Sequence, residues 1–233
     1  MKNALALLAL STAAYACSPT QQDSQTASTT TDTPAVMTAV EDADVAAIGG
    51  TGVPTGYVGR TDRPDQQLTA AKYAVSGTGW DVTTGPAHIL YRPGDTASGS
   101  YTVTTTIDQL AAPAHPEAYG VFVGGNGLDG AGQRYLYFLV RGTGELMARV
   151  REGDKTRNVL AWQKHAAVPA ANASGQASYK LAIQVAGDSV RLRVNDQPVA
   201  TVAAAGLPTS GVYGNRINHN LHVRATPPTV TRP

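Results

Sequence analysis

The chain has 233 residues, a formal net charge of +1 at pH 7 with histidine neutral, and 42% hydrophobic residues. This length fits one domain with extensions, and the near-neutral charge excludes binding driven by the phosphates of nucleic acids. The 24 glycines, 14 prolines and 10 tyrosines favour turns and strands over long helices.

The first sixteen residues have the pattern of a secretory signal peptide. Lys2 provides a short positive region, and an apolar stretch runs from Ala4 to Ala14. The letters AYA at residues 14–16 match the small-x-small pattern of a cleavage site. The apolar stretch is too short to cross a hydrocarbon core of ~30 Å, which needs about 20 residues. We therefore expect residues 1–16 to be removed on export.

Cys17 is the only cysteine, which excludes an intramolecular disulfide and a cysteine-based metal site. Its position directly after AYA resembles a bacterial lipobox, although Ala14 stands where leucine is preferred. The resemblance implies that Cys17 is lipidated and anchors the protein in the cell envelope. Ser18 resembles the residue that permits sorting to the outer membrane. Cleavage by an ordinary signal peptidase, leaving a free cysteine, is the alternative.

Residues 17–50 have the composition of a linker. The segment 18–34 nearly lacks large apolar side chains, so it cannot bury enough surface to offset its chain entropy, and we expect a disordered tether. Residues 34–50 could form a short helix between Pro34 and Gly49. Five acidic residues and no basic one fall within 18–50, whereas the remainder is mildly basic. We expect one domain at 51–226 and a loose tail at 227–233.

From about residue 86 onward the pattern is that of strands separated by short turns. Residues 134–141, for example, alternate in polarity and are rich in aromatic and β-branched side chains. Strands recurring at this spacing predict an all-β sandwich or barrel. We expect them at 87–93, 100–110, 118–124, 134–141, 145–151, 156–163, 178–185, 189–195, 198–203, 211–214 and 221–225.

Alternation also assigns faces, because successive side chains of a strand point to opposite sides of the sheet. In 134–141 the odd-numbered residues belong to the face away from the core. In 145–151 the two arginines belong to the same face, which we expect to be polar. Aromatic rings and arginine donors on a sheet face are typical of sites for sugars and other polyols. A solvated sheet face is the alternative. The candidate ligand-binding residues are Tyr135, Tyr137, Arg141, Arg149, Arg151 and Trp162.

The loop VGGNGLDGAGQRY, at 123–135, matches two motifs by spacing. Gly125, Gly127 and Gly130 spell G-x-G-x-x-G, but a dinucleotide site requires a helix next, whereas the aromatic, alternating sequence that follows predicts a strand. The letters GGNGLD match the start of a calcium-binding repeat, of which only one partial copy is present. Asp129 is therefore a candidate ligand for Ca²⁺, with an ordinary turn residue as the alternative. We expect no other cofactor.

Familiar catalytic motifs are missing from the sequence. There is no H-E-x-x-H, no G-x-S-x-G and no Walker A motif, and His219 and His222 form at most a weak candidate metal pair.

Three stretches resemble the concanavalin A-like lectin/glucanase superfamily, nearest to its laminin G-like and 3-keto-disaccharide hydrolase-like branches. They are residues 118–154, the hairpin YKLAIQVAGDSVRLRVNDQPVATV, and LPTSGVYGNRINHNLHV near the end. The resemblance covers about residues 70–226. It implies a two-sheet antiparallel jelly-roll β-sandwich whose concave face often binds carbohydrate.

The hydrolases of this superfamily that resemble glycoside hydrolase family 16 use carboxylates alternating along one strand. Retaining hydrolysis needs two carboxyl groups about 5–5.5 Å apart, and no predicted strand carries such a pair. The leading hypothesis is an envelope lipoprotein whose jelly-roll domain binds a glycan or another envelope ligand on its concave sheet without catalysis. The alternatives are a hydrolase of the 3-keto-disaccharide type and a protein-interaction module of the laminin G type.

Overall fold

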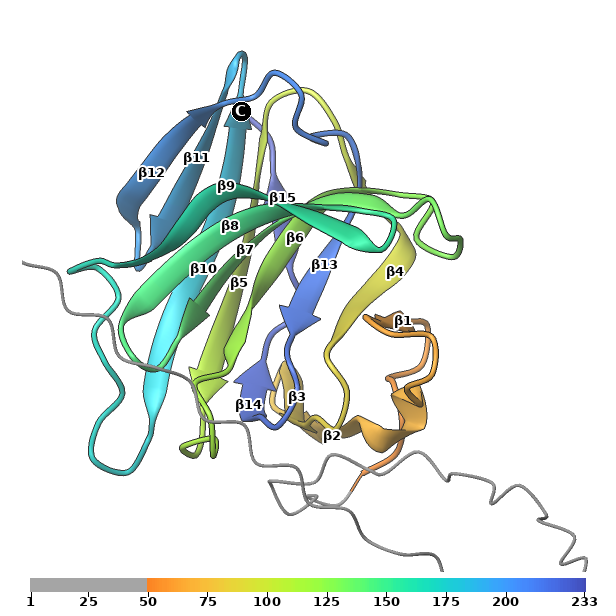
Figure 1. Cartoon of the computed structure of the whole chain (residues 1–233), viewed down its shortest axis with the longest axis vertical. Coiled ribbons are helices and arrows are strands. Elements are labelled where there is room, and N and C mark those ends of the chain that lie inside the picture. Colours follow the sequence, from red (N-terminus) through yellow and green to blue (C-terminus); the bar gives the residue numbers. More distant parts are fainter. Residues whose placement is uncertain (1–49) are drawn as a thin grey trace, which may run out of the picture. The chain divides into compact units, whose positions relative to one another are not determined.

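A computed structural model describes residues 50–233 (Figure 1). The expected signal peptide, the lipidated Cys17, the tether and nearly all of the helix expected at 34–50 lie outside the described residues. Within residues 50–233 no helix is long and apolar enough to cross a membrane.

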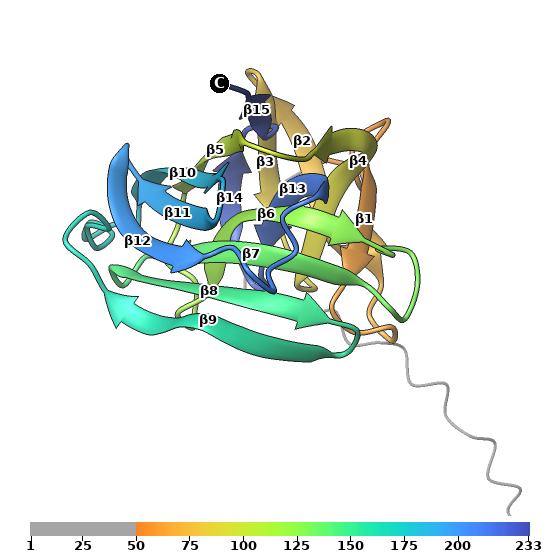
Figure 2. The same cartoon turned by 90° about the horizontal axis from the view of Figure 1, so that it is seen from above.

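The described chain forms two antiparallel sheets packed face to face, as Figure 2 shows from above. One sheet has seven strands, in the order β1 (Val58–Thr61), β4 (His88–Ala97), β13 (Gly211–Ile217), β6 (Ala118–Asn126), β7 (Arg134–Arg141), β8 (Glu145–Glu152) and β9 (Lys155–Lys164). The predicted two-sheet jelly-roll sandwich is therefore confirmed.

The second sheet has eight strands and packs behind the first. Its order is β12 (Gln197–Ala203), β11 (Ser189–Val194), β10 (Ala177–Ala186), β5 (Tyr101–Gln109), β14 (His222–Ala225), β3 (Gly79–Thr83) and β2 (Lys72–Ser76), with β15 (Thr229–Thr231) also paired to β5.

The main core lies between the sheets and follows the predicted alternation. Leu136, Phe138 and Val140 of β7 are fully buried there, opposite side chains such as Ile107 and Leu181 of the other sheet. Large buried tyrosines satisfy their hydroxyl groups at the edge of this layer. The Tyr179 hydroxyl donates to the Pro169 carbonyl and the Tyr101 hydroxyl donates to the Thr209 carbonyl.

The structure differs from the sequence prediction mainly before residue 86 and at the C-terminal end. The short strands β1, β2 and β3 and a 3-10 turn, η1 (Leu68–Ala70), were not predicted. Strand β4 runs through the expected turn after residue 93. The expected loose tail includes β15, whose residues 229–231 pair with 102–104 of β5. These strands are short or rich in turn-forming residues, so their pairing partners, rather than local sequence, stabilise them.

His88 is a buried polar residue at the start of β4. Its Nδ1 lies 2.9 Å from the Pro86 carbonyl oxygen, which can only accept, so Nδ1 carries the proton. The other nitrogen, Nε2, then accepts from the Tyr73 hydroxyl. Burial lowers the pKa of His88 to about 4, because the charged imidazolium would lose its hydration.

This pKa predicts that folding stability depends on pH through His88. In the unfolded chain histidine titrates near 6.5, so between about pH 6.5 and 4 the unfolded state binds a proton that the folded state does not. We expect the free energy of unfolding to fall by about 2–3 kcal/mol between pH 7.5 and 4.5 because of this residue. In His88→Gln we expect this contribution to the decrease in the free energy of unfolding to disappear. Urea unfolding of the wild type and the variant at both pH values measures the difference. An unchanged pH dependence in His88→Gln would contradict the assignment.

Candidate functional site

The outer face of the seven-stranded sheet, turned away from the main core, carries a second apolar cluster. It contains Ile89, Tyr91, Ala118, Phe122, Leu128, Tyr135, Tyr137, Leu139 and Met147, with Trp162 and Val212 partly buried against it. All of these residues belong to this one sheet or to the loop between β6 and β7. The cluster therefore forms a packed layer on the sheet's outer surface.

The burial of this layer corrects the expectation of a polar outer face. Tyr135 is 1% exposed and Tyr137 is 3% exposed. The rings of Phe122 and Tyr135 lie 5.2 Å apart, and those of Tyr135 and Tyr137 lie 5.7 Å apart. The guanidinium of Arg216 covers the Tyr137 ring, 4.7 Å from its centroid. Tyr135 and Tyr137 are therefore buried beneath this surface, and their rings are not exposed for stacking against a ligand.

Arg216 is the central charged residue of the outer face. The register of β13 places it beside Ile89 of β4 and Gly120 of β6. Its guanidinium makes a two-pronged ion pair with Asp62, with nitrogen–oxygen distances of 2.7 and 2.6 Å. It also donates to the Tyr135 hydroxyl over 3.2 Å. The Arg216 side chain is only 7% exposed, whereas that of Asp62 is 24% exposed.

The environment keeps the Asp62 carboxyl group ionised. Burial raises its pKa, but hydrogen bonding and charge from Arg216, together with the charge of Arg151, outweigh burial and place the pKa below its usual value. The positive charge of Arg216 is retained for the same reason, since its partners raise its pKa further despite burial. The pair is therefore a stable anion and a stable cation over the physiological range of pH.

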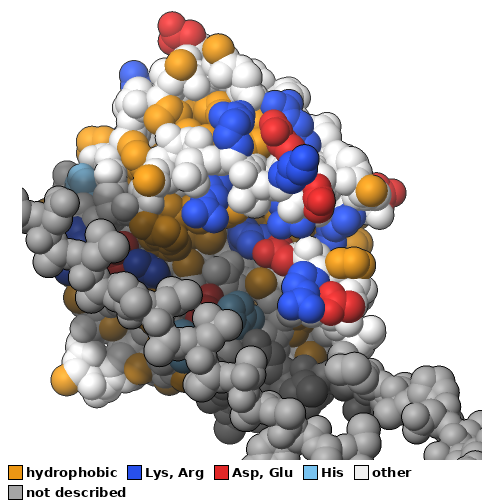
Figure 3. Space-filling model, viewed as in Figure 1, with side chains coloured by type: hydrophobic (Ala, Val, Ile, Leu, Met, Phe, Trp, Pro, Cys, Tyr) orange, Lys and Arg blue, Asp and Glu red, His pale blue; other side chains and the backbone are white. Residues whose placement is uncertain are grey.

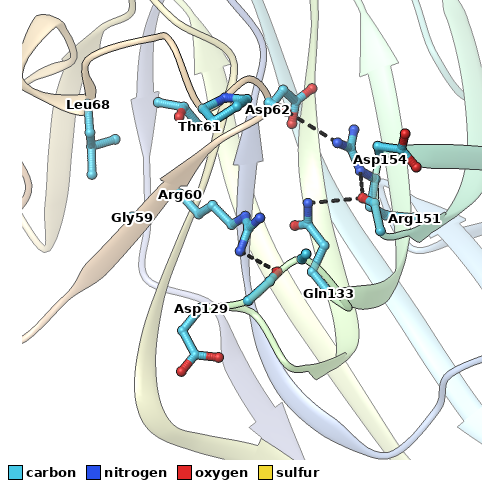
Figure 4. Close-up of a pocket in the computed structure, with 13 residues that line it drawn as sticks. Gly59, Arg60, Thr61, Asp62, Leu68, Asp129, Gln133, Arg151 and Asp154 are labelled. Atoms are coloured by element: carbon cyan, nitrogen blue, oxygen red, sulfur yellow. Dashed lines mark hydrogen bonds between the residues drawn. The ribbon is translucent and has the colours of Figure 1, made fainter.

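A pocket of about 540 Å³ opens beside this ion pair (Figure 4). Three segments form its walls: β1 with the residues that follow it, the loop between β6 and β7, and the hairpin between β8 and β9. The polar residues that line it are Arg60, Thr61, Asp62, Asp129, Gln133, Arg151 and Asp154. Figure 3 shows basic and acidic side chains interspersed on the side of the molecule that carries this hairpin.

Hydrogen bonds tie the three walls together. Arg60 donates to the carbonyl oxygens of Leu128 and Gly130 at 2.7 and 2.8 Å, which joins β1 to the loop between β6 and β7. Arg151 donates to the Gly153 carbonyl at 2.6 Å and to the Asp62 carbonyl at 3.2 Å. Gln133 donates to the same Gly153 oxygen at 3.1 Å. The pocket is thus a braced cavity whose three walls are hydrogen-bonded to one another.

The candidate residues predicted from the sequence fall into separate parts of the outer face. Arg151 lies on the pocket wall. Arg149 donates to the Asn158 side chain on β9. Arg141 and Trp162 contact each other in a separate part of this face, where the Arg141 guanidinium lies 4.3 Å from the centroid of the Trp162 ring. Arg141 also forms an ion pair with Glu145 at 2.7 Å.

Sequence reasoning missed several polar residues of this site. Asp62 and Arg60 lie between residues 51 and 86, where no element was predicted, Gln133 lies in the glycine-rich loop, and Asp154 lies in the turn between β8 and β9. Arg216 lies just beyond the strand predicted at 211–214. The sequence did contain a signal for Arg216. It is a charged residue two positions beyond that strand, and strand alternation would place it on the outward-facing side.

The loop between β6 and β7 is a hairpin connection, as predicted, because the two strands it joins are antiparallel neighbours. The strand that follows it excludes the dinucleotide site. Among residues 50–233 no group of three or more histidine, cysteine, aspartate or glutamate side chains could hold a metal ion. Asp129 lines the pocket on this loop, and its role as a calcium ligand stays a prediction.

Comparison with known proteins supports the fold. No protein-family model and no curated protein sequence matches the chain. A carbohydrate-binding module, CBM66, from Bacillus subtilis is similar in structure, with a TM-score of 0.57, 13% identity, and coverage of 76% of this chain and 95% of that one. A Bacillus subtilis protein of unknown function with a galectin-like fold follows, with a TM-score of 0.54, 10% identity, and coverage of 76% and 89%.

An enzyme of the same architecture is also similar. The GH16 protein of the Bacteroides ovatus mixed linkage glucan PUL, in complex with its G4G4G3G product, has a TM-score of 0.53, 6% identity, and coverage of 77% of this chain and 97% of that one. At these identities the likeness establishes the jelly-roll fold. The concanavalin A-like superfamily and its laminin G-like or 3-keto-disaccharide hydrolase-like branch stay predictions.

Two glycines of the hairpin loop provide a test of this pocket wall. Gly124 and Gly127 have positive φ angles, of 65° and 57°. A Cβ at Gly127 meets only ordinary contacts, whereas one at Gly124 would lie 2.0 Å from the Pro208 carbonyl oxygen. We expect Gly127→Ala to cost about 1–2 kcal/mol for the left-handed conformation, and Gly124→Ala about 3 kcal/mol or more because the Pro208 loop must also move. Urea unfolding measures both, and equal losses would contradict the close approach.

Proposed function

We propose that this protein binds carbohydrate without catalysis, on the outer face of the seven-stranded sheet. The observation that carries the proposal is the braced pocket beside the Arg216–Asp62 pair. Sugars present many hydroxyl groups and apolar ring faces, so their sites combine fixed polar groups with an aromatic layer. The pocket supplies the polar groups, the buried aromatic layer supports them, and Trp162 offers a partly open ring beyond them.

The named functions of two structural neighbours agree with this proposal. CBM66 is a carbohydrate-binding module, and the GH16 protein holds an oligosaccharide product. Their fold therefore presents a surface on which sugars bind in those proteins, and we extend this property to the present chain.

The charges on the outer face favour binding over hydrolysis. A glycosidase needs a carboxylic acid that stays protonated until it donates, and therefore one with a raised pKa. Asp62 is held ionised by Arg216. Hydrogen bonds from Arg141 and then Thr143 lower the pKa of Glu145. Neither of these two carboxylates suits the role of general acid. A hydrolase of the 3-keto-disaccharide type and a protein-interaction module of the laminin G type are the alternatives.

The first test is binding of glycans by the domain and its variants. A glycan array followed by calorimetry identifies the ligand. We expect Arg151→Ala and Trp162→Ala to weaken binding by about tenfold or more, because the first loosens the pocket walls and the second removes the open ring. Arg224→Ala is the control, since Arg224 lies on the eight-stranded sheet in an exposed ion pair with Asp81. The absence of any glycan ligand for the wild-type domain overturns the proposal.

We further propose that the protein is a lipoprotein, exported with residues 1–16 as signal peptide and anchored through Cys17, most simply in the outer membrane. The support is the sequence pattern around Cys17. Diacylation and N-acylation together would provide the several chains that stable attachment requires.

The anchor is tested by Cys17→Ser in the full chain expressed in a Gram-negative host. We expect the variant to leave the membrane fraction and to lack the acyl mass that intact-mass spectrometry detects in the wild type. A variant that stays in the membrane fraction with unchanged mass contradicts the lipid anchor. Arg224→Ala in the same host should fractionate as the wild type does, because it leaves the first 49 residues untouched.

A further inference from the structure

The pocket offers hydrogen-bond acceptors as well as donors to a ligand. Each of the guanidiniums of Arg60 and Arg151 uses two of its five N–H groups in hydrogen bonds to wall carbonyl groups. Asp129 and Asp154 also line the pocket, and within the described residues no hydrogen bond or ion pair engages their carboxylates. A ligand that brings hydroxyl donors therefore complements these walls.

Asp62 is the carboxylate that combines exposure to the pocket with a fixed orientation. Each of its oxygens accepts one hydrogen bond from Arg216, and its backbone carbonyl accepts one from Arg151. An ionised carboxylate has about four lone-pair directions, so further acceptor positions remain. The Asp62 side chain is 24% exposed, and Asp62 is among the residues that line the pocket.

We propose that Asp62 is the ligand-binding and specificity-determining residue of the pocket, that Arg216 is its positioning residue, and that the pocket selects neutral, hydroxyl-rich saccharides over saccharides bearing carboxylates. This inference rests on the proposed function. Two adjacent hydroxyl groups of a sugar donate to the free positions of the Asp62 carboxylate. A uronic acid would instead bring its own carboxylate against those of Asp62, Asp129 and Asp154, and like charges at close range oppose binding.

The groups packed around Asp62 keep it an acceptor. Arg216 from β13 and Arg151 from β8 bring positive charge, and Tyr135 from β7 completes the hydrogen bonding of Arg216. His88 from β4 is buried, its pKa is lowered to about 4, and it is neutral above that pH. Without Arg216, only the weaker influence of charges such as that of Arg151 would oppose burial, so the pKa of Asp62 would rise toward the range in which it takes up a proton.

The experiment uses the full chain and two probes of equal length, the neutral mixed-linkage glucan tetrasaccharide G4G4G3G and tetragalacturonate, measured by calorimetry at pH 7.5. Laminarihexaose and cellohexaose serve as second neutral probes. We expect a neutral probe to bind at least tenfold more tightly than tetragalacturonate. Asp62→Asn should weaken neutral binding by at least tenfold.

Arg216→Met tests the positioning role through a readout that loss of packing would not produce. We expect the wild-type affinity to be similar at pH 7.5 and 5.0, whereas the affinity of Arg216→Met falls as pH is lowered, because its Asp62 then takes up a proton. Arg216→Lys retains the charge and should restore the flat profile. Single variants can lose stability by leaving one buried charge unpaired, so the double variant Asp62→Asn/Arg216→Met removes both charges and should bind no more weakly than Asp62→Asn alone.

A matched control lies three residues along the chain. Arg63 and Asp65 form an exposed ion pair of the same chemistry, with a nitrogen–oxygen distance of 2.6 Å, and neither side chain lines the pocket. Arg63→Met/Asp65→Asn should leave binding unchanged.

Failure of this inference differs from failure of the proposed function. If Asp62→Asn binds the neutral probe as tightly as the wild type, or if tetragalacturonate binds more tightly than every neutral probe, the inference is wrong while carbohydrate binding stands. If no glycan of the array binds the wild type, the proposed function itself is wrong.

Discussion

The ion pair between Arg216 and Asp62 joins two parts of the chain that are 154 positions apart in sequence. It fastens the segment after β1 onto β13, in the middle of the seven-stranded sheet, and so creates one wall of the pocket. A buried ion pair contributes little net stability, yet removing one partner typically costs about 3–5 kcal/mol. The pair therefore acts mainly by determining where this segment lies, and the hydrogen bonds from Arg151 and Arg60 reinforce the same arrangement.

The aromatic layer beneath the pair gives it a rigid base. The Tyr135 ring packs at a tilt against those of Phe122 and Tyr137, and the two tyrosines present a hydroxyl group and a ring face to Arg216. A sheet face covered by large packed side chains holds charged groups with less loss of conformational entropy than a loop does. The outer face is thus a second small core whose upper surface is polar, and the two tyrosines contribute to a site without being open to solvent.

Long strands could be predicted from the sequence because their signal is local. Strand β5 alternates in polarity over its nine residues, and the structure places its faces as that alternation requires, whereas β7 is buried on both faces along most of its length. The strands before residue 86 have four or five residues and are stabilised by their neighbours, so composition could not identify them. For the site, Arg151 was identified from its strand, but Asp62 and Arg216 form a site only after distant segments pair. The burial of Tyr135 was not predicted, because alternation along a strand assigns each side chain to a face of the sheet but does not tell which other side chains cover that face.

Strand β5 has consequences for the order in which the molecule assembles. One of its edges pairs with β10, while the other pairs with both β14 and β15, more than a hundred residues later. During synthesis from the N-terminus, this second edge of β5 therefore stays unpaired until β14 and β15 have been made. Because the pairing partners of β5 are so distant in sequence, the sheet forms slowly. Until it forms, the unpaired strand edge is open to pairing with other chains. If the protein is exported as proposed, the late completion of this sheet delays folding of the chain before transport.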